Sequence, residues 1–150
     1  MKEQDLEFLT GIYQNTKTAI QSINDILPQV KDKDLKHELS NELTEYEVIS
    51  RECEMIAGNR YEEVKDNNWF EKAKLWTSIK INSMTDNSTR HLAEMLLIGT
   101  IMGTLDCYKL ITDNQKAPKE LLMLCGKLLK LEEDFFNNLK HFLKSYKDND

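Results

Sequence analysis

The sequence contains few of the residues that interrupt helices. Its 150 residues include 5 glycines and 2 prolines. Because glycine and proline are the strongest helix breakers, their scarcity favours long, uninterrupted helices. Valine, isoleucine and threonine also never alternate with polar residues over several positions, as they do in a half-buried strand. The sequence therefore argues against a β-sheet.

Cysteine is also scarce, and the three that occur form no metal-binding or disulfide pattern. Cys53, Cys107 and Cys125 are odd in number, widely spaced and without a CxxC pair. We expect buried, reduced thiols and a cytoplasmic protein. A disulfide between Cys107 and Cys125 is not expected, because the apolar spacing places Cys125 on the inward face of its helix and Cys107 off it.

Long hydrophobic runs and an excess of positive charge are missing as well. The longest segment of low charge, 95–105, is shorter than the roughly 20 apolar residues that cross a bilayer. The charged segment Met1–Asp5 does not match a signal peptide. A formal net charge of −6 argues against nucleic acid or an anionic membrane as the main partner. These features predict a soluble globular protein.

Apolar residues recur at intervals of three and four positions, which is the spacing of amphipathic helices. Breaks at Pro28, Gly58 and 86–88 divide the pattern into helices over about 5–27, 32–58, 68–84 and 88–113, followed by a last helix from Pro118. Short connections favour antiparallel neighbours. We therefore predict one all-α domain over residues 1–150, an up-and-down four-helix bundle with one additional short helix.

The same spacing predicts which side chains face the core. In the second long helix these are Leu35, Leu39, Glu42, Tyr46, Ile49, Cys53 and Ile56. In helix 88–113 they are His91, Glu94, Ile98, Ile101, Leu105 and Tyr108. In the last helix they are Leu121, Cys125, Leu128, Glu132, Phe135, Leu139, Phe142 and Tyr146. Leu39, Ile49, Ile98, Ile101, Leu128 and Leu139 are the predicted core residues. Gly99 and Gly103 are predicted to allow a close approach within the bundle.

Three segments carry a resemblance to a known family: Leu43–Glu47, Ser88–Met95 and Leu131–Phe135. In these segments and in the order of its helices, the chain resembles a family of small, uncharacterised helical-bundle proteins of Gram-positive bacteria, which is grouped by shape with ferritin-like bundles. The resemblance implies a ferritin-like fold, and it does not imply an activity.

Glutamates at inward positions are the most distinctive chemical feature of the pattern. A buried carboxylate has to be protonated, hydrogen-bonded, paired or bound to a metal. His91, Glu94, Glu42 and Glu132 together offer one nitrogen and three carboxylate ligands, a set that suits iron, manganese or zinc. The paired Glu-x-x-His motifs of di-iron bundles are absent, because helix 88–113 carries the reversed order and the last helix has Phe135 at the ligand position. Two other interpretations stay open: exposure at the edge of the core, or hydrogen bonds from Tyr13, Tyr46 or Tyr108.

Three interpretations of function follow. No complete catalytic set and no phosphate-binding loop can be identified, which favours a non-enzymatic protein that binds a partner. The aromatic residues Trp69, Phe70 and Trp76 of helix 68–84 are then candidates for a homodimer or protein-partner surface. The alternative is a divergent ferritin-like metal-binding protein that uses the carboxylate and histidine residues. A binder of small molecules in the bundle core is the third.

Overall fold

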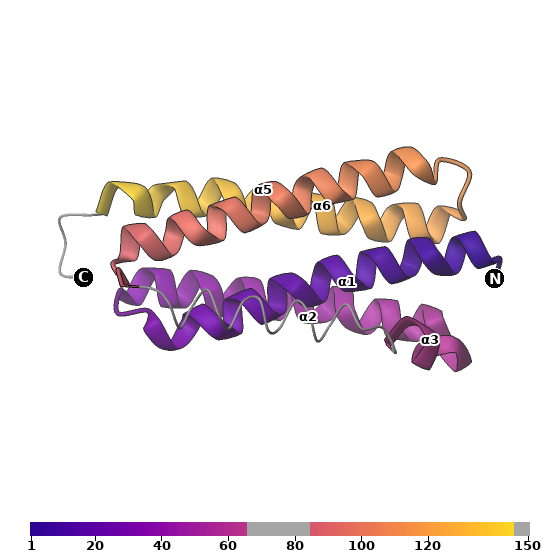
Figure 1. Cartoon of the computed structure of the whole chain (residues 1–150), viewed down its shortest axis with the longest axis horizontal. Coiled ribbons are helices and arrows are strands. Elements are labelled where there is room, and N and C mark those ends of the chain that lie inside the picture. The colour runs from indigo at the N-terminus through magenta and orange to yellow at the C-terminus, as the bar shows by residue number, and fades with distance from the viewer. Residues whose placement is uncertain (66–84, 146–150) are drawn as a thin grey trace.

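The computed structural model describes residues 1–65 and 85–145, and four long helices form its bundle (Figure 1). The helices are α1 Glu3–Ile26, α2 Lys33–Ala57, α5 Thr89–Asp113 and α6 Lys119–Leu139, with the short α3 Tyr61–Lys65. Single 3-10 segments cover Leu27–Gln29, Gly58–Arg60 and Lys140–Ser145. No strand occurs within 1–65 or 85–145, so the all-α prediction is confirmed for these ranges. The predicted helix 68–84, with Trp69, Phe70 and Trp76, lies outside the described residues.

The helices pair antiparallel with their neighbours in space. α1 packs against α2 and α5, and α6 packs against the same two helices. Figure 1 shows that α1 and α6 run in one direction along the bundle and that α2 and α5 run in the other. Neighbours are therefore antiparallel, as predicted, and the parallel pairs lie on the diagonals. α2 and α5, which are successive long helices of the described residues, run the same way (Figure 1).

Short-range chemistry fixes the helix ends near the predicted positions. The Asp32 carboxylate accepts a hydrogen bond of 2.9 Å from the Leu35 amide at the start of α2. The Ser88 hydroxyl accepts one of 3.2 Å from the His91 amide at the start of α5. Both side chains satisfy amides that have no partner inside the helix. At the end of α2, Gly58 has a φ of +55°, which a glycine adopts without steric cost.

The predicted faces of α2 and α6 are buried, and that of α5 is not. Leu39 and Ile49 of α2 and Leu128 and Leu139 of α6 are buried, as predicted. In α5 the prediction is wrong, because Ile98 is 56% and Ile101 is 54% exposed. The residues of α5 that are buried instead are Thr89, Leu92, Ala93, Leu96, Leu97, Thr100 and Cys107. Both faces of α5 are apolar, so the spacing alone did not determine which one faces the core.

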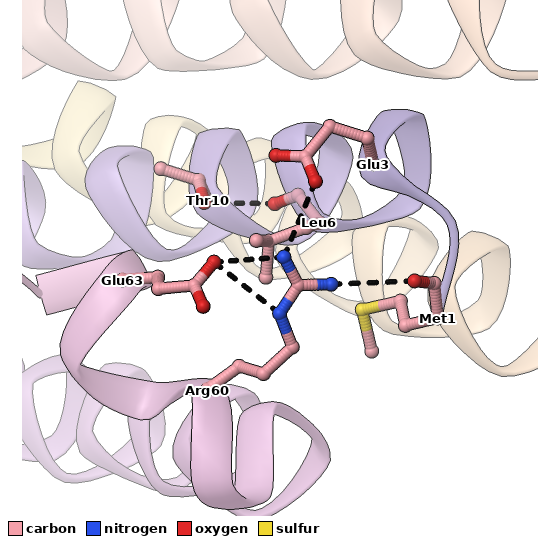
Figure 2. Close-up of polar contacts among 6 residues, drawn as sticks. All are labelled: Met1, Glu3, Leu6, Thr10, Arg60 and Glu63. Carbon is pink, nitrogen blue, oxygen red and sulfur yellow. Dashed lines mark hydrogen bonds and ion pairs between the residues drawn. The ribbon is translucent and has the colours of Figure 1, made fainter.

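Arg60 holds the turn after α2 against the first turn of α1 (Figure 2). Its guanidinium donates to the Met1 carbonyl oxygen at 3.2 Å, to Glu3 at 3.2 Å and to Glu63 at 2.7 Å. The group lies at the surface, where ion pairs contribute little to stability because water screens them. We therefore assign Arg60 a positioning role at this end of the bundle.

Candidate functional site

Two of the four residues proposed as metal ligands lie in the core. Glu42 of α2 is 7% exposed and Glu132 of α6 is 2% exposed. Their inward orientation was predicted, and the structure confirms it. Both helices place them on the same face as leucines and aromatic residues, and the Glu42 carboxyl also lies near the carboxyl groups of Glu38 and Glu45.

The other two lie at the surface. The side chain of His91 is 36% exposed and that of Glu94 is 45% exposed. Glu94 accepts a hydrogen bond of 3.2 Å from Arg90 on the same helix. The inward orientations predicted for His91 and Glu94 are therefore wrong, because α5 turns its other face to the core. Among the described residues, no three or more His, Cys, Asp or Glu side chains are grouped so that they could hold a metal ion.

Glu132 reaches across the bundle to α5, where Gly103 makes room for it. A Cβ atom at Gly103 would collide with Oε2 of Glu132. The Cys107 thiol donates a hydrogen bond of 3.3 Å to Oε1 of the same carboxyl. From α1, the Asn15 amide donates to the Gly103 carbonyl oxygen at 3.0 Å. The close approach predicted at Gly103 is thus made by a side chain of α6, and the prediction that Cys107 lies off the core is wrong.

Tyr46 contributes a buried hydroxyl to the same region. Its ring packs edge-to-face on Phe135, with ring centroids 6.2 Å apart. In the described part of the chain, the Tyr46 hydroxyl and Oε2 of Glu42 are buried without a hydrogen-bond partner. One of the interpretations left open by the sequence is that a tyrosine hydroxyl donates to the inward glutamates. The donor to Glu132 is Cys107 instead, and Tyr108 donates to Glu133 at the surface.

The protonation states of the two carboxyls follow from their surroundings. Burial raises the pKa of Glu132 to about 8, although the Cys107 hydrogen bond acts in the opposite direction. Burial also raises the pKa of Glu42 to about 8, with further contributions from Glu38 and Glu45. Both groups are therefore mostly neutral at pH 7.

A second polar cluster ties α3 to the bundle. Glu54 of α2 accepts hydrogen bonds of 3.3 Å from Tyr13 of α1 and from Tyr61 of α3. The two phenol oxygens are also 3.3 Å apart. Burial raises the pKa of Tyr13 well above its ordinary value, so this hydroxyl stays protonated and acts as a donor. The cluster joins three helices and is a structural feature.

The surface feature that the sequence did not reveal is an apolar face on α5. We define the α5 face as Ile98, Ile101, Met102, Leu105 and Tyr108, whose exposed fractions lie between 50% and 57%. All of them except Met102 are residues that the sequence predicts to face the core, and for these four the prediction is wrong. By length and composition alone, α5 is apolar enough to cross a membrane, although the low-charge run within it had been predicted to be too short. Only 22% of its most apolar window is buried in the bundle.

The cysteines lead to a prediction about reactivity. Cys53, Cys107 and Cys125 are all buried and free. Burial raises the pKa of Cys53 to about 12, and hydrogen bonding with Cys125 and burial raise the pKa of Cys107. Ellman's reagent at pH 8 should therefore react at least about tenfold more slowly with the folded protein than with the denatured one, which should titrate three thiols.

Met55→Cys provides the control for this measurement, because Met55 is exposed on α2. The folded variant should show one fast thiol in addition to the three slow ones. Fast reaction of the native cysteines in the folded protein would contradict their enclosure in the core.

Comparisons of the chain with protein-family models, curated proteins and solved structures gave no match.

Proposed function

We propose that this protein is a non-enzymatic interaction protein that binds a helix of another protein chain through the α5 face. The observation that carries the proposal is five large apolar side chains, each about half exposed, on one face of one helix. Scattered apolar residues are normal on protein surfaces, whereas contiguous ones mark binding sites. A partner helix with its own apolar stripe is the complement of such a straight, narrow face.

The interior of the described residues supports a structural role. Glu132 is enclosed between helices and accepts a hydrogen bond from Cys107, and neither Glu132 nor Glu42 belongs to a described group of three or more side chains that could hold a metal ion. Membership of a ferritin-like family, metal binding and a cytoplasmic location stay predictions. No contact within the described residues specifically favours the metal-binding alternative, so we propose one function.

Photo-cross-linking from the α5 face tests the proposal. A photoreactive methionine analogue placed at Met102 should give covalent protein adducts in cells that produce the full chain. Met55 is the matched control, since it is a methionine with a larger exposed fraction, 80% against 57%, on a different helix. We expect several-fold more protein adduct from Met102 than from Met55. Equal yields, or adducts with lipid only, would contradict the proposal.

A further inference from the structure

Charged residues continue the α5 face toward both ends of the helix. Arg90 and Glu94 precede Ile98 by steps of four, and Lys109 and Asp113 follow Leu105 by the same steps. Residues spaced in this way lie on one side of a helix. The side chains of Arg90 and Glu94 are 48% and 45% exposed, and Lys109 and Asp113 are also exposed. The face thus has an apolar centre and two charged ends.

The order of the charges is self-complementary. From the start of α5 to its end, the signs at the two charged ends are positive, negative, then positive, negative. Asp106, one turn after Met102, is a further exposed negative residue beside the face, and in an antiparallel pairing it has no charged residue of α5 at its level. At the two charged ends, reversing the helix end for end places a negative residue opposite each positive one and a positive residue opposite each negative one. A pattern of this kind fits an isologous interface, in which the same surface patch of two copies pairs with itself.

We infer that a second copy of this chain covers the α5 face, with the two α5 helices antiparallel and the two-fold axis passing between Ile101 and Met102. The inference rests on the proposed function, since it names the partner of the same face. In this register Ile101 of one copy lies at the level of the other copy's Met102, and Ile98 lies at the level of the other copy's Leu105. The apolar centres therefore cover each other.

The same register aligns the charged ends. Glu94 of one copy lies at the level of the other copy's Lys109, and Arg90 lies at the level of the other copy's Asp113. The two-fold axis repeats each pair, which gives four opposite-charge pairs around the apolar centre. A parallel arrangement would instead place Glu94 opposite Glu94 and Lys109 opposite Lys109. Complementary charges at the rim fix register and orientation more than they add affinity, so the antiparallel dimer is the specific one.

A lipid surface fits the face less well. Helices that lie on membranes carry lysine and arginine on their polar side and bind anionic lipid through them. Arg90 and Glu94 cancel in charge, as do Lys109 and Asp113, while Asp106 adds a negative charge, and the chain as a whole carries a formal net charge of −6. A bilayer also gives no reason for the alternation of sign. A second copy accounts for both the apolar centre and the charge order.

Sedimentation equilibrium of the full chain tests the inference. The wild-type protein should approach twice the chain mass of 17.6 kDa at micromolar concentrations. Glu94→Lys alone, or Lys109→Glu alone, should weaken dimerisation by about tenfold or more, because each creates like-charge pairs in the antiparallel register. The double variant should recover wild-type affinity, and an equimolar mixture of the two single variants should form heterodimers. Glu47→Lys, an equal charge change at an exposed site of α2, should leave dimerisation unchanged.

Two further measurements complete the test. Ile101→Lys changes an exposed residue, so the variant should keep its helical circular dichroism and should be monomeric. A wild-type monomer at several hundred micromolar, or dimers that survive Ile101→Lys and both charge reversals, would overturn the inference. If the protein is a monomer that binds phosphatidylcholine vesicles and buries the α5 face in them, the dimer inference is overturned and lipid is the occupant of the face. If Met102 cross-links to a different protein, the inference that a second copy covers the α5 face is wrong, whereas the proposed function is still supported.

Discussion

The free energy of unfolding should fall as the pH rises from about 5 to about 8, by several kcal/mol. Glu42 and Glu132 keep their protons in the folded bundle until about pH 8, whereas in the unfolded chain they release them near their ordinary pKa of 4.5. Between these values the folded state binds more protons than the unfolded state, so stability falls as the pH rises. The stability that these groups contribute is complete below pH 4.5 and is lost as the pH passes through 8.

The size of the effect follows from the width of this window. Each pH unit within it costs up to about 1.4 kcal/mol for Glu132, and less for Glu42, because part of the rise in the Glu42 pKa comes from neighbouring carboxyl groups whose charges water screens. Since small domains are stable by roughly 5–15 kcal/mol, this loss would be a large fraction of the total. Urea unfolding at a fixed protein concentration and at several pH values measures it.

One variant isolates the contribution of Glu132 to the pH dependence of stability from that of every other titrating group. Glu132→Gln keeps the shape of the side chain and cannot ionise, so about half of the pH dependence should disappear and stability at pH 8 should rise. The matched control is Glu133→Gln, the exposed neighbour on the same helix, which should leave the pH dependence as it is. Parallel curves for the wild type and Glu132→Gln would show that Glu132 ionises normally in the folded protein.

Replacing Gly103 by alanine should destabilise the protein by roughly 1–3 kcal/mol, the usual cost of overpacking a core. A Cβ atom at Gly103 meets the carboxyl of Glu132, which is enclosed and accepts a hydrogen bond from Cys107. Moving the carboxyl aside breaks that bond and disturbs the surrounding core. At Gly126 of α6, where a Cβ would meet nothing within 4 Å, alanine should instead stabilise by up to about 1 kcal/mol through helix propensity.

Removing the Glu132 carboxyl tests whether it causes the different effects of alanine at Gly103 and at Gly126. In a Glu132→Ala background, Gly103→Ala should lose most of its penalty, because the colliding atoms are gone. A double-mutant cycle measured by urea unfolding gives the coupling between the two residues directly. The same penalty at Gly103 in both backgrounds would show that a group other than Glu132 fills the space beside this glycine.

The sequence predicted helix ends and two core glutamates correctly because local chemistry determines them. Asp32, Gly58 and Ser88 act within one turn of their own helix, so their identity and position suffice. Glu42 and Glu132 sit in helices whose opposite faces are clearly charged, so only one face of each could be buried.

The orientation of α5 could not be predicted in this way. Leu92 and Leu96 lie on one side of the helix and Ile98 and Ile101 on the other, and both sets are apolar. The choice between them depends on contacts with α1 and α6, such as the space at Gly103 that accepts Glu132. The errors at Glu94 and Cys107 have the same origin, because a rotation of one helix exchanges its inward and outward residues.

The alternation of helix directions also shapes the electrostatic field at the ends of the bundle. Each helix carries roughly half a positive charge at its amino end and half a negative charge at its carboxyl end. At either end of the bundle, two helices that lie on one diagonal have their amino ends, and the two helices on the other diagonal have their carboxyl ends (Figure 1). These four partial charges form a quadrupole, whose field falls off much faster with distance than that of a dipole. Charged side chains, with their net excess of acid, therefore dominate the field that an approaching molecule meets.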